Sequence, residues 1–357
     1  MLTVRSLLMI LVLLSMPARG EVPFFDGGHI KAGWLSTNYP AESVFRDAVA
    51  AVTHDQAAEL RLKFRASPGP LQLQADYQWL ARHGDSVALA ARFNDLFLLP
   101  PVLPDDDRRW WDLTHEISSS DDTAVVQRLD RLALSWAGEK TFVRFGRQAV
   151  SWGNGLIYNP LDFFNPFDPA AVDTEYKLGD DMFYGQYLLD SGNDLQLVNV
   201  QRRDEEGSVT QSVSSTALKF HGFGLDREFD LLLAEHFDQT LIGGGGVLNV
   251  GESVLRGDVM VTDAEDDWVA SAVVNWSYSW TWQGVNISGV AEYFFNGFGL
   301  READYTAEKI AAAQDLVQRI ERGELFTLGR HYLAGSLMIE LTPLVNLTPN
   351  LFYNMGD

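Results

Sequence analysis

Three basic side chains at alternate positions form the polar pattern with the clearest chemical meaning. Arg61, Lys63 and Arg65 share one face if the segment is a strand, because residues i and i+2 point to the same side. Such a stripe, opposed by acids across a lumen, creates a field that orients and selects polar solutes. The alternative is a set of salt bridges that fix one segment to another. Further basic candidates are Arg82, Arg131, Arg144, Arg147 and Arg202, and the acidic candidates are Glu59, Asp162, Asp168, Asp173 and Glu175.

Patterns that indicate catalysis or metal binding are weak. The sequence has no GxSxG, HExxH or glycine-rich phosphate-loop motif, and its histidines show no ligand spacing. Without cysteine it has no disulfide and no thiolate metal site. We therefore predict no enzymatic activity, no cofactor and no metal. Two alternatives stay open: a Ser-His constellation assembled across strands at a rim, and calcium bound by the acidic loop 263–267.

The segments around the basic stripe alternate with a period of two. Polar and apolar residues alternate over 59–66, and after the turn 67–70 they alternate again over 71–79. The same pattern covers 268–282 and 285–296. Such segments predict β-hairpins with one apolar and one polar face.

Roughly fifteen such segments of about ten residues follow one another, the length of a tilted strand that crosses a bilayer. Short turns alternate with long connections, such as 91–123, 153–181 and 297–329. Tryptophan and tyrosine crowd the apolar faces, as membrane-interface girdles require. We predict an all-β fold, an antiparallel transmembrane β-barrel formed by residues 21–357. A secreted sandwich or propeller is the alternative.

The stretch 146–179 interrupts the strand pattern. Its Asn-Pro and Asp-Pro pairs set turns and exclude both helix interior and central strand, yet it also carries Trp152 and several phenylalanines. An aromatic segment of this length usually packs against something. We predict that residues 153–181 fold into the barrel as a constriction or a plug.

A second long connection contains a predicted loop helix over residues 305–322. Thr306 is its expected N-cap, Asp315 and Arg319 are spaced for an i,i+4 pair, and Gly323 is expected to end it. The helix either rests on the mouth of the barrel or acts as a gate.

The first 20 residues have the organisation of a secretory signal, with Arg5, an apolar run and small residues before Glu21. A short membrane anchor is the alternative. Of 27 Lys and Arg, the two Arg of this segment leave 25 against 49 acids, a net charge of −24. Nucleic acid is therefore an unsuitable partner. We expect the outer membrane of a Gram-negative bacterium, with lipid, lipopolysaccharide and the barrel assembly machinery as partners.

The stretch GRQAVSWGNGLIYNPLDFFNPFDP, followed by DTEYKLGDD, resembles the signature of a group of Gram-negative outer-membrane porin-like proteins. It is more distantly similar to the alginate-export and capsule-assembly (Wzi-like) barrels. The resemblance implies a monomeric barrel of about 16–18 strands with an inward-folded loop, associated with envelope transport systems. The matching positions are Gly146, Arg147, Gln148, Trp152, Gly153, Pro160, Asp162, Asn165 and Pro166.

The end of the chain departs from this family pattern. Such barrels end in a strand with a terminal aromatic residue, whereas this sequence ends LFYNMGD. Single-chain bacterial barrels also have even strand numbers. We therefore expect the last strand or strands to be missing from this sequence.

Two functions fit these features. The first is a porin-like channel for passive or export-linked passage of an organic solute, with its lumen narrowed by residues 153–181. The second is a non-conducting barrel that binds surface polysaccharide or an envelope transport partner.

Overall fold

The structure is a computed structural model that describes residues 24–39, 46, 50–92, 102–169, 171, 173–224, 227–264, 267–301 and 305–356. The predicted signal at residues 1–20 lies outside these ranges. Among the described residues, no helix has both the length and the apolar character needed to span a membrane.

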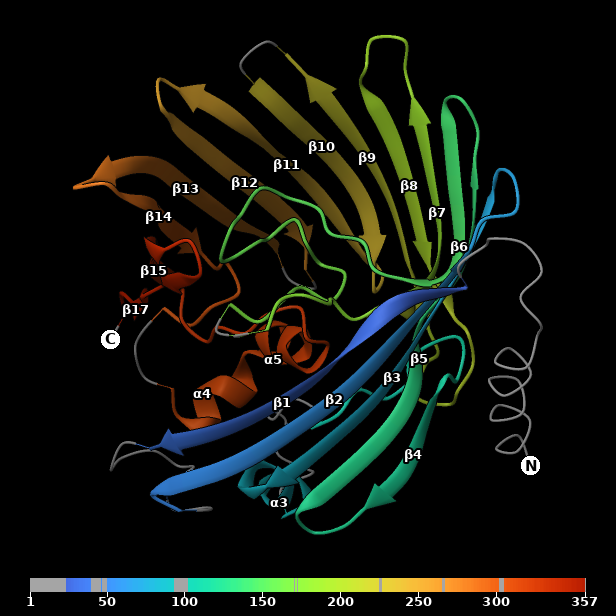
Figure 1. Ribbon diagram of the computed structural model, residues 1–357, viewed down its shortest axis with the longest axis vertical. Coiled ribbons are helices and arrows are strands. Elements are labelled where there is room, and N and C mark those ends of the chain that lie inside the picture. The colour runs from blue at the N-terminus through green and yellow to red at the C-terminus, as the bar shows by residue number, and fades with distance from the viewer. Residues whose placement is uncertain are drawn as a thin grey trace.

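One antiparallel sheet of 17 strands forms the wall of the molecule (Figure 1), which confirms the predicted all-β fold class. Its strands are β1 (Phe25–Asn38), β2 (Val52–Ala66), β3 (Leu71–Gly84), β4 (Thr114–Ser119), β5 (Thr123–Ala137), β6 (Thr141–Gln148), β7 (Asp180–Leu188), β8 (Asp194–Val200), β9 (Ser215–Phe223), β10 (Arg227–His236), β11 (Gln239–Val250), β12 (Ser253–Asp263), β13 (Trp268–Trp282), β14 (Val285–Phe295), β15 (His331–Thr342), β16 (Val345–Leu347) and β17 (Asn350–Asn354). The described helices are α3 (Asp85–Arg92), α4 (Ala307–Ala312), α5 (Gln314–Glu321) and the short 3-10 helix η1 (Gln211–Val213).

At two places in the wall, two short strands pair with the same edge of one longer strand. β4 and β6 both pair with the edge of β5 opposite to β3, and β16 and β17 both pair with β15. Most strands pair with their neighbours in the sequence, as hairpins require. Within the described residues, β1 pairs with β2 alone and β17 with β15 alone, so the sheet is not closed between these two edges (Figure 1).

Connections at the two ends of the sheet differ in length, as the sequence predicts. At one end, tight turns join β2 to β3, β5 to β6, β7 to β8, β11 to β12 and β13 to β14. At the other end lie the connections 149–179, 201–214 and 296–330, together with the segment that carries α3 and β4. The long connections therefore gather at a single end of the barrel.

The two faces of the wall have opposite character. Leu231 and Leu233 of β10 are 57% and 55% exposed on the outer face, whereas the preceding residue, Asp230, is buried on the inner face. Likewise, Trp276 of β13 is 49% exposed and Asn275 is buried. An outer apolar face and an inner polar face suit a wall surrounded by lipid.

The predicted loop helix is correct in place but not in form. It is divided into α4 and α5, because the backbone leaves the helical region at Ala313 (φ −91°, ψ 67°). The Thr306 hydroxyl accepts a hydrogen bond from Lys309 N, which confirms the predicted N-cap. Arg319 pairs with Glu324 at 3.0 Å instead of with Asp315, because the chain turns back towards α5 after the helix ends.

Gly146 allows β6 to approach β5 and gives a first prediction. Its φ is +129°, and an added Cβ collides with the Leu132 carbonyl oxygen, which is backbone and has no room to shift. Gly192 also has a positive φ, +88°, but no atom lies within 4 Å of an added Cβ. Gly192→Ala is therefore expected to cost only left-handed strain, about 1–2 kcal/mol. We expect Gly146→Ala to cost about 1–3 kcal/mol more, measured by urea unfolding in lipid vesicles. Equal losses contradict this assignment.

Candidate functional site

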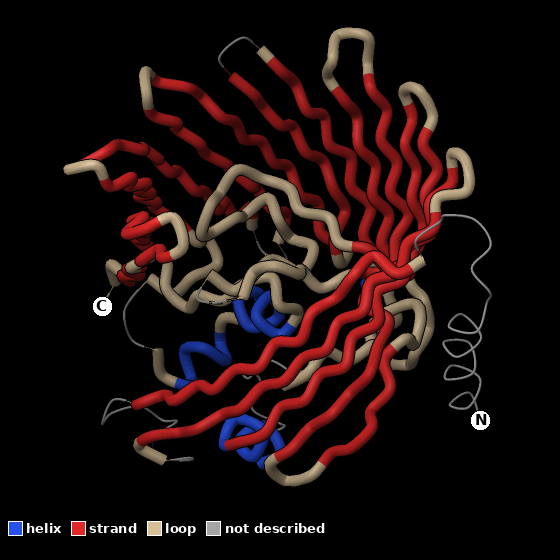
Figure 2. The backbone as a smooth tube through the Cα atoms, viewed as in Figure 1, coloured by secondary structure: helices blue, strands red, loops and turns tan. Residues whose placement is uncertain are grey.

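The inward-folded loop that the sequence predicts at residues 153–181 is the connection 149–179 between β6 and β7, and its described residues lie inside the barrel (Figure 2). Backbone N–H groups of this loop bind the far wall. The Glu292 carboxylate on β14 accepts from the backbone N–H groups of residues 156–158, at 2.6 to 3.2 Å. Asp258 on β12 accepts from Asn154 N at 2.6 Å and Gly155 N at 3.0 Å. Two buried carboxylates are thus satisfied by consecutive peptide donors, an arrangement that holds anions in backbone nests.

Apolar packing fills the space between this loop and strands β7–β12. Trp152, Phe163 and Phe164 form an aromatic cluster with ring centroids 4.3 to 6.2 Å apart. This cluster packs against inward-facing side chains that include Leu232 and Ala234 of β10. A second contact stacks Tyr158 on Phe294 of β14, with centroids 4.7 Å apart. The period-two pattern does not predict this apolar interior, because a strand that is apolar on both faces gives little alternation.

The returning limb of the loop contacts the opposite wall. Lys31 of β1 pairs with Asp173 at 2.6 Å and with Glu175 at 2.8 Å. The ring of Tyr176 lies 4.0 Å from the Arg61 guanidinium of β2, a cation–π distance. The loop therefore spans the lumen and is fixed at both sides.

The predicted basic stripe lies on the inner face of β2, but it does not face the loop acids. Arg61 is 2% exposed and pairs with Asp130 of β5 at 2.6 Å. Arg65 pairs with Asp26 of β1 at 2.7 Å. Lys63 lies 3.4 Å from the Tyr176 hydroxyl, and Arg61 also contacts the ring of Tyr176, but neither reaches a loop acid among the contacts described. Most of the stripe is therefore neutralised by acids of the wall itself, and this corrects the expected field between stripe and loop.

The remaining predicted side chains lie elsewhere in the loop and wall. Asp162 forms an ion pair with Lys177 of the same loop. Burial raises the pKa of the Asp162 carboxyl to about 6, against the opposing effect of the Lys177 ammonium. Asp168 lines a cavity beneath the loop, and the Arg144 guanidinium donates to the Gln74 side chain.

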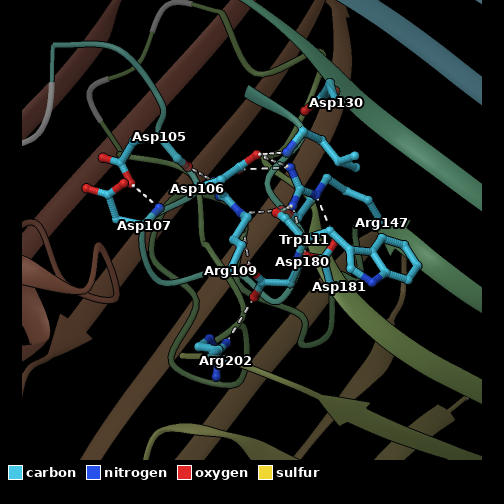
Figure 3. Close-up of polar contacts among 12 residues, drawn as sticks. Asp105, Asp106, Asp107, Arg109, Trp111, Asp130, Arg147, Asp180, Asp181 and Arg202 are labelled. Atoms are coloured by element: carbon cyan, nitrogen blue, oxygen red, sulfur yellow. Dashed lines mark hydrogen bonds and ion pairs between the residues drawn. The ribbon is translucent and has the colours of Figure 1, made fainter. Parts of the chain in front are cut away.

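Arg147, a predicted lumen residue, is instead the centre of a buried ion-pair cluster (Figure 3). Its side chain is fully buried, so it meets no solute. It contacts Asp106 and Asp181 at 2.8 Å each, and donates to the Trp111 carbonyl at 2.7 Å. Asp181 is its cross-strand partner on β7. Neither partner could be read from the sequence, because the long loop 149–179 separates β6 from β7 and Asp106 comes from another connection.

The same cluster joins three connections of the barrel. Arg109 pairs with Asp106 at 3.1 Å and donates to the Gly179 carbonyl at 3.0 Å, where the inward loop ends. Asp180 then pairs with Arg202 at 2.9 Å. The start of β7 is thereby held by both neighbouring connections (Figure 3).

The positions of the family-like motif have structural roles. The Gln148 amide donates to the Met182 carbonyl at 3.2 Å, and the Trp152 indole donates to the Gln196 side chain at 2.8 Å. Gly153 and Asn165 have positive φ values of 90° and 51°. Two further motif residues line the cavity beneath the loop, namely Pro160 and Pro166. The motif therefore encodes how the loop leaves β6 and turns.

A serine, a histidine and a carboxylate do meet across strands. Ser215 Oγ lies 2.7 Å from His236 Nδ1, and His236 Nε2 lies 2.9 Å from Glu324 Oε1. This order of groups is that of an acyl-transfer triad. However, Ser215 is 2% exposed and its hydroxyl also accepts from Arg202 at 2.7 Å, so no substrate reaches it. Among the described residues, no three His, Asp or Glu side chains gather as a metal site.

Comparisons with known proteins show similarity to outer-membrane proteins of known structure. No family model and no curated protein matches the sequence. Pseudomonas putida OprB at high pH is 12% identical, with 93% of this chain and 89% of that chain covered and a TM-score of 0.47. An anion-selective porin from Comamonas acidovorans is 11% identical, with 91% and 88% covered and a TM-score of 0.43. Acinetobacter baumannii OccAB4 is 10% identical, with 89% and 79% covered and a TM-score of 0.43. The resemblance to porin-like and Wzi-like barrels stays a prediction.

Glu292→Gln tests the attachment of the loop to β14. A glutamine offers one acceptor oxygen, so at least one of the three N–H groups faces an amide donor. We expect a loss of about 3 kcal/mol in the local stability of residues 156–158, the worth of hydrogen bonds to a charged group. Amide exchange of these residues measures it. Glu340→Gln on β15 is the control, because the Glu340 carboxylate accepts from the exposed Asn286 side-chain amide and from no loop backbone among the described residues. Unchanged exchange in Glu292→Gln contradicts the attachment.

Asp106→Asn tests the buried cluster through its pH dependence. Burial opposes ionisation of Asp106, but Arg147, Arg109 and Arg128 outweigh it and lower the pKa from 3.8 to about 2. Because the pKa of Asp106 is lower in the folded than in the unfolded protein, its ionised form adds about 2 kcal/mol to the free energy of unfolding above pH 4. This contribution is lost as the pH falls towards 2. We expect the protection factor of the Leu113 amide, which donates to Asp106, to fall over this range in the wild type.

In Asp106→Asn the same protection factor is expected to be low at every pH and to lack this acid-dependent fall. The neighbouring exposed Asp107 provides the control Asp107→Asn, which should behave as the wild type. A wild-type protection factor that stays constant from pH 4 to pH 2 contradicts the role of Asp106.

Proposed function

We propose that this protein is a porin-like channel of the Gram-negative outer membrane, and that residues 149–179 form a fixed constriction for an organic solute. The observation that carries the proposal is the attachment of one loop to two opposite walls, through Glu292 and Asp258 on one side and Lys31 on the other. A loop held in this way narrows the lumen permanently and does not act as a gate that opens and closes. Lipid, lipopolysaccharide and the assembly machinery are the partners such a protein needs.

The charges that a passing solute meets are those of the returning limb and of its partner Lys31 on β1. The Lys31 side chain is 32% exposed, and the side chains of Asp173 and Glu175 are 54% and 55% exposed. Arg61 and Arg147, in contrast, are buried and paired. We therefore assign selection of the solute to the size of the gap and to these three exposed groups, rather than to the whole basic stripe.

A second candidate is the non-conducting barrel that binds a polysaccharide or an envelope transport partner on its loops. The observation in its favour is the dry packing of Trp152, Phe163 and Phe164 against β7–β12, which removes that side of the lumen from any water path. Conductance measurements separate the two candidates.

Lys31→Ala is expected to free the returning limb, because it removes both ion pairs of that limb with β1. We expect a larger and noisier single-channel conductance in planar bilayers. Lys140→Ala removes an exposed ion pair with Asp190 at a tight turn and is the matched control, with unchanged conductance expected. Deletion of residues 151–178 should raise the conductance further. If this deletion leaves conductance and ion selectivity unchanged, the proposed constriction is refuted. If neither the wild type nor the deletion variant conducts ions, the binding barrel is favoured.

A further inference from the structure

A cavity of about 920 Å³ lies beneath the inward loop. It is bounded by that loop, by strands β11–β15 and β17, and by the connection 296–330. This volume falls in the range of sites that enclose a small organic molecule. None of the described residues that line the cavity belongs to β1.

The wall of this cavity is mainly apolar and aromatic. Its aromatic side chains come from the loop, from two strands and from the 296–330 connection, and include Tyr158, Phe163, Phe167, Phe294, Phe326 and Phe352. Aliphatic side chains such as Leu241, Met260 and Val290 complete it. Aromatic faces and aliphatic groups bind apolar carbon and offer few hydrogen bonds.

The charged groups of the wall are already paired. Arg319 and Glu324 lie 3.0 Å apart, and Asp162 pairs with Lys177 behind the wall. Asp168 likewise has a partner. A charged solute would lose its water in this cavity and gain no free counter-charge, which is costly. Neutral polar side chains, among them Thr262, Ser271 and Asn350, form a minority of the wall, so the cavity favours a solute that is mainly apolar.

The cavity is pre-formed, because its walls are fixed independently of any solute. Glu292 holds residues 156–158, and Tyr158 stacks on Phe294. On the opposite side the Asn296 amide donates to the Thr327 carbonyl at 3.2 Å. A pre-formed apolar site binds without a large ordering cost.

We propose that this cavity binds an uncharged, mainly apolar organic solute, such as an aromatic or alkyl compound. The inference rests on the proposed function, since the solute reaches the cavity through the lumen, and it names the class of that solute. The loop then has two faces: one lines a path with exposed charges at Asp173 and Glu175, and the other covers the apolar site.

Ser336→Cys provides the test, because Ser336 lines the cavity and the chain contains no cysteine of its own. The full-length variant is placed in lipid nanodiscs and labelled with a water-soluble maleimide. Naphthalene is the uncharged probe, with maltose and 2-naphthalenesulfonate as polar and anionic comparisons. At ten times its Kd, naphthalene should slow labelling about tenfold, since about a tenth of the sites stay free.

Thr281→Cys is the matched control. Thr281 is exposed on the same face of β13 as Asn275 and lies outside the cavity, so naphthalene should not change its labelling. Equal protection of Ser336→Cys by maltose or by the sulfonate overturns the inference, and so does the absence of protection by naphthalene. Conductance of the same samples is measured in parallel. If the protein conducts ions but naphthalene does not slow the labelling of Ser336→Cys, the apolar site alone is refuted. If naphthalene slows the labelling but the protein conducts no ions, the proposed function alone is refuted.

Ser336→Phe gives an independent check by filling the cavity. Equilibrium dialysis with radiolabelled naphthalene should show a Kd at least about tenfold weaker than in Thr281→Phe, which adds the same ring outside the site. Heat-dependent migration in gels confirms that both variants fold. Equal affinities in the two variants overturn the assignment of the site.

Discussion

The structure depends on the hydrogen bonds between two buried carboxylates and the backbone of the inward loop. Glu292 and Asp258 stand on neighbouring parts of the wall, and both are shielded from water, so each needs donors. The peptide groups of residues 154–158 supply them and are themselves satisfied inside the barrel. An irregular segment is tolerated at this depth only when its backbone groups find such partners.

The other contacts of the loop follow from this attachment. Once residues 154–158 are fixed, Trp152 and Phe163 pack against the apolar inner face of β7–β12, and the chain must cross back to reach β7. Its return brings Asp173 and Glu175 to Lys31, and ends at Gly179 beside Arg109. The Arg147 cluster then fixes the start of β7. The proposed constriction and the apolar cavity lie on two sides of the same segment.

Much of the fold was predictable from local patterns. Period-two alternation identifies the hairpins, and the Asn-Pro and Asp-Pro pairs identify the inward loop. The break between α4 and α5 could not be predicted, because alanine favours helix and neither proline nor glycine stands at Ala313. The partners of the basic stripe were also out of reach. Arg61 pairs with Asp130 and Lys31 with Asp173, and these residues are distant in the sequence and meet only when the sheet curves.

The central claim is that the loop occupies one fixed position across the lumen. It is tested most directly by electron-spin distance measurements in outer-membrane vesicles, with spin labels at Thr174→Cys in the loop and Thr281→Cys in the wall of the cysteine-free chain. The account predicts a single narrow distance distribution, which broadens when Lys31→Ala is added. A broad or multiple distribution in the protein with Lys31 intact would contradict it, because it would show a loop that is not held between the two walls.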